Sequence, residues 1–267
     1  MSADLLSLPL RGQTVLNLRA AEDAAALTVP LRNRGATVIE HPVLKFAPPE
    51  SWVPFDSKAR TLKPGDCVAF TSATAVRMSL DRLATLGIPS EGLKVSRLAA
   101  VGRGTAQALA AAGLTPAIVP KDEFQAEGLR DALLAQLRPG EGVWLPRAQS
   151  GRESLIEDLA ARGHPVEVTP VYRTIAAPGG LGPVNAAILQ GRIDWIVFTS
   201  SSMVEHFVSG LDRDAKYLLS KVRIACLGKI TAQTAREAGL RVDVVPARQD
   251  LVGLVEALAE SAKSAMH

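Results

Sequence analysis

Short apolar runs alternate with longer alanine-rich or amphipathic segments along most of this chain. Apolar runs of four to six residues are typical of buried strands, and the longer segments are typical of helices. The first part of the chain predicts a strand at 14–18, a helix reaching about residue 34, and a second strand at 36–40. Gly35 is placed to end the helix. This βαβ unit is expected to have a right-handed crossover.

The same alternation continues to the end of the chain and predicts an α/β protein with parallel sheets. Further strands are predicted at 67–70, 98–101, 117–119, 143–145, 165–168 continued by 171–174, 194–198, 222–226 and 242–245. Further helices are predicted from Ser72 through Leu83, at 126–137, at about 151–163 and at 250–262. Prolines interrupt residues 45–63, which predict a linker and a loop with a short helix near 57–62. The Gly182-Pro183 pair predicts a break.

Two glycine turns in the chain are nearly the same. They are Val101-Gly102-Arg103-Gly104-Thr105 and Leu227-Gly228-Lys229-Ile230-Thr231. In each, an apolar run ends at a glycine, whose backbone can adopt geometry that a Cβ resists. A Thr three residues later is placed to cap an alanine-rich helix. The N–H groups and the dipole of such a helix start suit an anion, although two ordinary βα units with standard caps would give the same pattern.

The two halves of the chain share spacings that indicate an internal duplication. Arg19 and Thr71 are 52 residues apart, and so are Arg147 and Thr199. These pairs are offset by 128 residues, and Gly102 and Gly228 are offset by 126. We therefore predict two similar doubly wound, mostly parallel-sheet domains of the flavodoxin-like kind.

Ligands of such sheets bind beyond the carboxyl ends of the strands. Small hydroxyls, glycines and single cations occupy these positions here, namely Arg19, Thr71, Ser72, Gly102, Arg103, Arg147, Thr199, Ser200, Gly228 and Lys229. They contain no pair of carboxylates, no Ser-His-Asp set and no Cys-His pair. Two facing domains would therefore present hydroxyls, cations and helix starts across a cleft, which predicts a site for a polyanion.

Composition narrows the classes of function. A content of 47% hydrophobic and 21% charged residues is typical of a soluble globular protein. No apolar run is long enough to span a bilayer, and the N-terminus lacks a secretory pattern, so we expect a cytoplasmic protein without membrane contact. A net charge of +3 with dispersed cations and 4% aromatic residues argues against nucleic-acid binding.

The motifs predict neither a metal nor a cofactor. Four scattered His residues have no ligand spacing, and Cys67 and Cys226 lie in apolar runs that predict core positions. The Gly102-Arg103-Gly104 turn starts like a dinucleotide fingerprint, but Gln107 stands at the third glycine position. The Gly228-Lys229 turn lacks the other residues of a phosphate-binding P-loop.

The whole assembly resembles the uroporphyrinogen-III synthase family. The motifs that carry the resemblance are Phe70-Thr71-Ser72, Phe198-Thr199-Ser200, the two glycine turns, Arg147-x-x-x-Gly151-Arg152-x-x-Leu155 and Val171-Tyr172-Arg173-Thr174. The chain departs from the family pattern at Leu18-Arg19-Ala20, at Ile230, where a second Thr is usual, and in an insertion at residues 50–63.

The resemblance implies a domain arrangement that the repeat alone does not suggest. The first α/β domain would comprise residues 1–40 and 177–267, and the second would comprise residues 50–166. Residues 41–49 and 167–176 would form a two-stranded connector. The duplication alone would instead predict two continuous domains with a boundary near residue 138.

The resemblance also implies the reaction. The substrate would be the linear tetrapyrrole hydroxymethylbilane, cyclised by a monomer to uroporphyrinogen III with inversion of ring D and loss of water. Tyr172 matches the residue proposed in the family to bind the leaving hydroxyl. Thr105, Thr231 and Arg152 join the strand-end residues as candidate groups for the carboxylates, although Tyr172 could simply pack in the connector. A non-catalytic two-domain clamp for an acidic metabolite or tetrapyrrole is the alternative.

Overall fold

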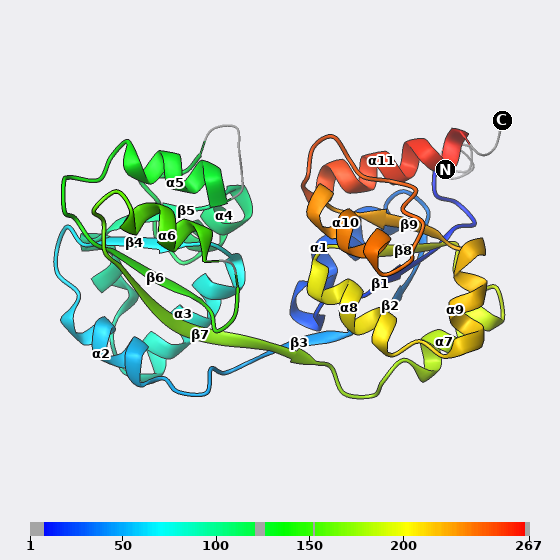
Figure 1. Cartoon of the computed structure of the whole chain (residues 1–267), viewed down its shortest axis with the longest axis horizontal. Coiled ribbons are helices and arrows are strands. Elements are labelled where there is room, and N and C mark those ends of the chain that lie inside the picture. Colours follow the sequence, from blue (N-terminus) through cyan, green and yellow to red (C-terminus); the bar gives the residue numbers. More distant parts are fainter. Residues whose placement is uncertain (1–7, 121–125, 152, 265–267) are drawn as a thin grey trace, which may run out of the picture. The chain divides into compact units, whose positions relative to one another are not determined.

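The computed structural model describes residues 8–120, 126–151 and 153–264. Its contacts divide the chain into two compact units. Unit 1 comprises Met1–Lys45 and Ile175–His267, and unit 2 comprises Phe46–Thr174. Figure 1 traces the chain through both units, and each is described here by itself.

Unit 1 contains a four-stranded parallel sheet in the order β2-β1-β8-β9. Its strands are β1 (Thr14–Asn17), β2 (Thr37–Glu40), β8 (Trp195–Phe198) and β9 (Arg223–Cys226). A single bridge between Ala225 and Val244 extends the sheet beyond β9.

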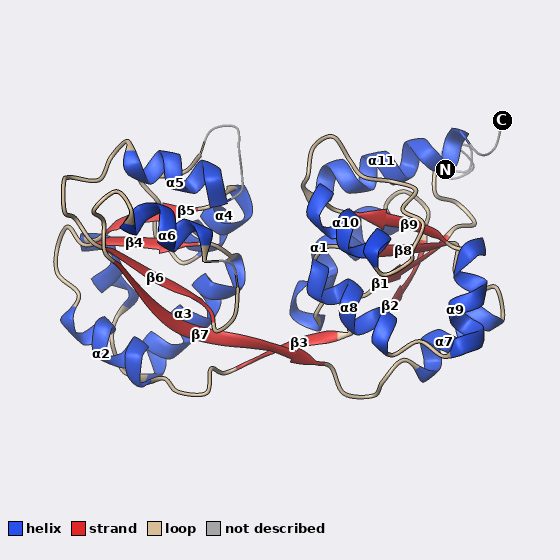
Figure 2. Ribbon diagram, in the orientation of Figure 1, coloured by secondary structure: helices blue, strands red, loops and turns tan. Residues whose placement is uncertain are grey.

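Helices cover both faces of the unit 1 sheet (Figure 2), because successive strand residues point to opposite sides. One face holds α1 (Ala21–Arg32) and α11 (Leu251–Ser264) over Val15, Trp195 and Val197. The other face packs against Leu16, Ile196 and Phe198. Its helices are α7 (Gly182–Leu189), α8 (Ser201–Ser209), α9 (Arg213–Leu218) and α10 (Lys229–Glu237), with a short 3₁₀ helix at Leu219–Lys221.

Unit 2 contains a five-stranded sheet in the order β3-β7-β6-β4-β5. Its strands are β3 (Leu44–Ala47), β4 (Cys67–Phe70), β5 (Arg97–Ala100), β6 (Val143–Ala148) and β7 (Val166–Ala176). Strands β7, β6, β4 and β5 are parallel, and Ile118 forms a single bridge with Ala99. The chain passes from unit 1 to unit 2 within β3 and returns within β7.

The sheet of unit 2 is also covered on both faces. Val68, Phe70 and Trp144 face one cluster, and Cys67, Ala69 and Leu145 face the other. The first cluster is completed by α2 (Val53–Thr61), α3 (Ala73–Thr85) and α4 (Arg103–Ala111). The second is completed by α5 (Ala126–Leu134) and α6 (Ser154–Ala160). A 3₁₀ helix at Ser90–Val95 precedes β5.

The duplicated sequence maps onto equivalent strands of the two units. Strands β1, β2, β8 and β9 of unit 1 occupy the positions that β6, β7, β4 and β5 occupy in unit 2. The bridges at Val244 and Ile118 fall in the same place at the edge of each sheet. Each unit thus combines two strands from one copy of the repeat with two from the other. The predicted α/β class with mostly parallel sheets is confirmed.

Several predicted elements differ from the structure. The strands expected at 117–119 and 242–245 are single bridges, and the helix expected near 57–62 is α2, which begins earlier at Val53. Helices α7 and α9 were not predicted. The Gly182-Pro183 pair, interpreted as a break, begins α7 instead, because proline in the first turn of a helix needs no hydrogen-bonded N–H. No helix among the described residues is long and apolar enough to cross a membrane.

The two cysteines are buried core residues, as predicted. Burial raises the pKa of both the Cys67 and the Cys226 thiols to about 12. At pH 8 the reactive thiolate fraction should therefore be on the order of 10⁻⁴. We expect the folded protein to resist iodoacetamide at pH 8, while mass spectrometry after guanidinium unfolding finds both thiols alkylated. Rapid labelling of the native protein would contradict this burial.

Candidate functional site

The strand order of each unit places a topological switch point between two neighbouring strands. In unit 1, β1 has β2 on one side and β8 on the other, and in unit 2, β6 and β4 meet in the same way. Connections leave these two strands in opposite directions, which opens a crevice at their carboxyl ends. Arg19 and Thr199 follow the strands of unit 1, while Arg147 and Thr71 lie at the ends of those of unit 2. The fold therefore brings an Arg and a Thr together in each unit, Arg19 with Thr199 and Arg147 with Thr71.

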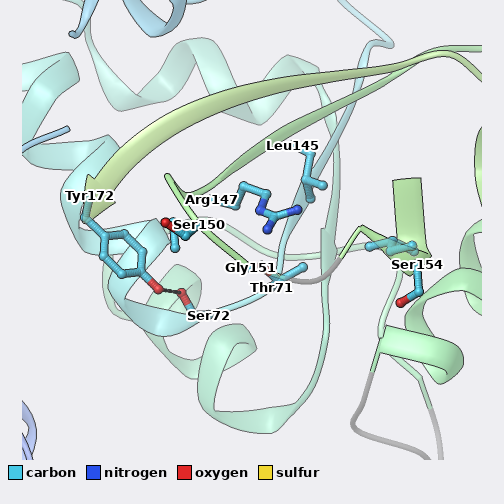
Figure 3. Close-up of a pocket in the computed structure, with 10 residues that line it drawn as sticks. Thr71, Ser72, Leu145, Arg147, Ser150, Gly151, Ser154 and Tyr172 are labelled. Carbon is cyan, nitrogen blue, oxygen red and sulfur yellow. Dashed lines mark hydrogen bonds between the residues drawn. The ribbon is translucent and has the colours of Figure 1, made fainter. Parts of the chain in front are cut away.

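The switch point of unit 2 contains a pocket of about 180 Å³ (Figure 3). Its walls come from the end of β4 with the start of α3, from β6 with the following loop and the start of α6, and from β7. Its lining residues are Thr71, Ser72, Leu145, Arg147, Ala148, Ser150, Gly151, Ser154, Leu155 and Tyr172. The pocket thus combines one cation with several hydroxyl groups.

Ser72 links the pocket to the start of α3. It is the N-cap residue, and its Oγ accepts a hydrogen bond of 3.0 Å from the N–H of Ala75. The same Oγ lies 3.3 Å from the Tyr172 hydroxyl, and Figure 3 shows the two side chains pointing toward each other. Ser200 caps α8 in unit 1 in the same manner, with a 3.3 Å bond from the Met203 N–H. A capping role for these serines was not predicted.

A β-bulge determines the side of the sheet on which Tyr172 lies. Pro170 pairs with Arg147, but the next pair is Tyr172 with Ala148, so the register shifts by one residue at Val171. Val171 and Tyr172 are consequently both buried in the cluster of α2 and α3. In a regular strand, successive side chains would face opposite sides. The bulge therefore turns Tyr172 toward Ser72, a common use of bulges next to functional sites.

Arg147 lies almost fully buried at the wall of the pocket. Its side chain is 8% exposed, and its Nη1 lies 3.4 Å from Oε1 of Glu153, a carboxylate that is 60% exposed. Gly151 leaves room for the guanidinium, since a Cβ at that position would overlap Nη2. A guanidinium held in this way keeps its charge and offers fixed donors to an anion.

The switch point of unit 1 has a corresponding arrangement around Arg19. Nη1 of Arg19 donates to the Thr199 hydroxyl at 3.3 Å, and Nη2 lies 3.5 Å from an oxygen of Asp23. Burial lowers the pKa of the Arg19 guanidinium, and the charge of Asp23 opposes that effect. Asn17 is fully buried and accepts a hydrogen bond from the Arg19 N–H, which fixes this strand end. Sequence reasoning did not identify Asn17, although a buried Asn ending an apolar run could have pointed to it.

The two glycine turns begin helices, but the prediction that Thr105 and Thr231 cap them is wrong. Gly102 and Gly228 are the N-cap residues, and the threonines lie inside the first turn, where both are largely buried. The backbone at both glycines is extended, with φ of −178° and −150°, so no special conformation requires glycine. In α10, Oε1 of Gln249 accepts a 3.3 Å bond from the N–H of Lys229 and lies where a Cβ of Gly228 would be.

The remaining candidates are distributed around these strand ends. Arg103 and Lys229 are exposed first residues of α4 and α10. Arg152 lies outside the described residues. Sequence reasoning missed Ser150 and Ser154, although both fall at unspecified positions of the Arg147-x-x-x-Gly151-Arg152-x-x-Leu155 motif. Ser150 lies in the loop after β6, and Ser154 is the first residue of α6. Within the described ranges, no group of three or more His, Cys, Asp or Glu residues could hold a metal ion.

Comparisons with known proteins agree on one family. The family model described as uroporphyrinogen-III synthase HemD matches residues 25–256. The uroporphyrinogen-III synthase of Synechococcus elongatus is 34% identical over 260 residues, which cover 96% of this chain and 97% of the relative. A putative uroporphyrinogen-III synthase of Methanothermobacter thermautotrophicus is 35% identical over 202 residues, or 73% of this chain and 78% of that protein.

Solved structures support the same assignment. A mutant uroporphyrinogen III synthase from the extremely thermophilic bacterium Thermus thermophilus has a TM-score of 0.61 at 25% identity, covering 95% of this chain and 100% of the other. The synthetase from Helicobacter pylori shares the fold with a TM-score of 0.60 at 19% identity, covering 95% and 99%. The resemblance inferred from the sequence is confirmed, and this chain belongs to the uroporphyrinogen-III synthase family.

Proposed function

We propose that this protein cyclises hydroxymethylbilane to uroporphyrinogen III, with inversion of ring D and loss of water, as a step of porphyrin and heme biosynthesis. The observation that carries the proposal is the Tyr172 hydroxyl, which lies in a polar pocket with Arg147 at the switch point of unit 2. Membership of the family supports the same reaction.

Tyr172 acts on the hydroxyl group that leaves as water. Because Ser72 Oγ already accepts the N–H of Ala75, its own proton can point at the Tyr172 oxygen, 3.3 Å away. The phenolic proton can then point into the pocket and hydrogen-bond to the departing hydroxyl. As the carbon–oxygen bond breaks, this hydrogen bond stabilises the negative charge that develops on the oxygen. The azafulvenium-like cation that remains is attacked by the substituted carbon of ring D, which forms a spiro intermediate. Its original bond from ring D to the bridge then breaks and re-forms at the free position of ring D. The proton lost as the ring becomes aromatic again balances the hydroxide, so that one water is released overall.

The strand-end cations and hydroxyls bind the carboxylates of the substrate. In unit 2 these groups are Arg147 and Thr71, while Ser72 contributes through its hydrogen bond to Tyr172. In unit 1 they are Arg19, Thr199 and Ser200. The helix starts at Gly102-Arg103 and Gly228-Lys229 supply further N–H donors and exposed cations, with Thr105 and Thr231 in their first turns. Arg152 has the same proposed role. Holding a flexible chain at many points favours one ring closure over the others, so geometry supplies much of the catalysis.

We also propose that the chain has a discontinuous domain of residues 1–40 and 177–267, a second domain of residues 50–166, and a connector of 41–49 and 167–176. This arrangement is supported by the boundary between the two compact units, which falls within β3 and within β7. A cytoplasmic monomer is the proposed form of the protein, and that proposal depends on the sequence and the family.

The role of Arg147 predicts a loss of substrate affinity when its charge is removed. Arg147→Gln should raise KM about 10- to 100-fold, the range for one charge-assisted hydrogen bond. Arg138→Gln is the matched control, because Arg138 is exposed and precedes β6 at the opposite end of the sheet. An unchanged KM for Arg147→Gln would remove Arg147 from the site.

The reaction itself is tested by the product isomer. Protein supplied with freshly generated hydroxymethylbilane, and with neither metal nor nucleotide added, should give mainly type III uroporphyrinogen. Tight binding of hydroxymethylbilane without any gain of type III would instead favour the non-catalytic clamp.

A further inference from the structure

Tyr172 is a departure from the internal repeat. The residue 128 positions earlier, at the equivalent place in the first copy, is Leu44, which is buried in the core of unit 1. The second copy has therefore placed a polar aromatic group where the first has an aliphatic one. A phenol that binds a substrate needs its ring held in one orientation. Gln149 forms hydrogen bonds both to the backbone of Tyr172 and to the segment next to its ring.

Gln149 lies directly after β6 and contacts two segments that are distant in sequence. Its backbone N–H donates to the carbonyl oxygen of Tyr172 at 2.7 Å. Its side-chain Oε1 accepts a hydrogen bond of 3.0 Å from the backbone N–H of Glu50. One residue therefore joins the backbone of Tyr172 to the segment that follows β3.

The segment at residues 46–50 in turn contacts the ring and the neighbour of Tyr172. The Phe46 ring meets the Tyr172 ring edge-on, with centroids 5.3 Å apart and an interplanar angle of 80°. The carbonyl oxygen of Pro48 accepts a 3.1 Å bond from Nε of Arg173. Edge-to-face packing of this kind fixes the orientation of both rings.

The sequence of this segment makes the bond to Gln149 necessary. Pro48 and Pro49 follow the end of β3 at Ala47, and neither has a backbone N–H. The N–H of Glu50 is consequently the first backbone donor after β3 that can hold the segment in place. Gln149 accepts that donor, so loss of its side-chain oxygen would loosen the chain at residues 48–50, directly after the end of β3 that contains Phe46.

We propose that Gln149 is a positioning residue for Tyr172, which it holds through its own backbone and through the segment at residues 46–50. The proposal rests on the function proposed above for Tyr172, but its structural part can be tested without any activity measurement. Gln149 does not touch the leaving hydroxyl in this account, and it acts only by fixing the phenol that does.

The structural test uses the small number of tyrosines in the chain. Tyr172 and Tyr217 are the two tyrosines, and Tyr217 is 80% exposed. Protein labelled with ¹³C in the tyrosine rings should give two sets of NMR signals, which Tyr217→Phe assigns. Gln149→Met keeps the size of the side chain but removes the oxygen. It should shift or broaden the Tyr172 signals and leave those of Tyr217 unchanged. Gln149→Glu, which keeps an acceptor oxygen, should restore the Tyr172 signals, and unchanged signals in Gln149→Met would overturn the proposal.

The kinetic test is a double-mutant cycle. Gln149→Met should lower kcat roughly fivefold, the size expected for one ordinary hydrogen bond, with KM within about twofold. The same change in a Tyr172→Phe background should have no further effect on kcat, because the group that Gln149 positions is already gone. Gln149→Glu should restore kcat, because it keeps the acceptor oxygen. Its added negative charge should change KM and not kcat. Gln136→Met, an exposed site near the end of α5, is the matched control.

The two tests separate this inference from the function on which it rests. An equal fivefold loss in both backgrounds would show that Gln149 acts independently of Tyr172 and would overturn the positioning role. A normal kcat in Tyr172→Phe would overturn the catalytic role of Tyr172. In that case the tyrosine signals of Gln149→Met alone decide whether Gln149 positions the ring.

Discussion

Replacing Tyr172 with Phe is expected to lower the kcat for uroporphyrinogen III formation about 100-fold, at the low end of the range for one acid–base group. The substitution removes the hydroxyl that binds the leaving group and keeps the ring that packs edge-on against Phe46. The free energy of unfolding should fall by only about 1 kcal/mol, because the hydrogen bond to Ser72 is lost. Steady-state rates with freshly generated substrate, together with thermal unfolding, measure both effects.

Tyr217→Phe is the control for this prediction. Tyr217 is 80% exposed on α9 of unit 1 and does not line the pocket, so the kcat of Tyr217→Phe should equal that of the natural protein. A Tyr172→Phe protein that folds and retains its kcat would contradict the proposed mechanism. Spontaneous closure gives the uninverted isomer, so the rates must be measured as type III product.

The second large effect concerns stability. Phe55→Ala should lower the free energy of unfolding by about 3–5 kcal/mol, as expected for a large buried aromatic residue replaced by alanine. Phe55 is fully buried, and its ring lies 5.3 Å from that of Trp144 and 5.8 Å from that of Trp52. It lies in α2, which forms within residues 50–63 and completes one side of the unit 2 core.

A hydrogen-bonded ion pair between Arg82 and Asp56 also joins α2 to α3. Arg82 donates two hydrogen bonds to Asp56, at 2.8 and 2.5 Å, and its guanidinium lies 5.0 Å from the centre of the Trp52 ring. Urea denaturation of Phe55→Ala measures the predicted loss. Val53→Ala in the same helix is the control and should change stability by less than about 0.5 kcal/mol, because Val53 is 72% exposed. A loss below about 1 kcal/mol for Phe55→Ala would mean that α2 does not belong to the core.

The sequence predicted much of the fold because parallel strands of this kind are marked by short apolar runs and a repeated spacing. The repeat predicted that Arg and Thr residues end these strands, but taken alone it would put Arg19 with Thr71 and Arg147 with Thr199. The pairing in the structure follows the discontinuous domains that the family resemblance implied. The hydrogen bond between Arg19 and Thr199 connects residues 180 positions apart in the chain, because β1 and β8 are neighbours in the sheet.

The details of the pocket could not be predicted in the same way. The register shift at Val171 depends on which residue of β6 pairs with Pro170. The pattern of apolar and polar residues within either strand does not predict that pairing. The contact between Gln149 and Glu50 joins two segments that the strand pattern treats as unrelated loops. Prolines near 48–54 suggested a loop, whereas Pro54 lies in the first turn of α2, where a helix tolerates proline.

The ratio of product isomers tests the central claim most directly. Purified protein is added to freshly generated hydroxymethylbilane, and the product is oxidised and separated by chromatography. The natural protein should give mainly type III product. With Tyr172→Phe, the product should return toward type I as spontaneous closure overtakes the slowed enzyme. Type I product alone, formed at the spontaneous rate by protein shown to be folded, would contradict the account.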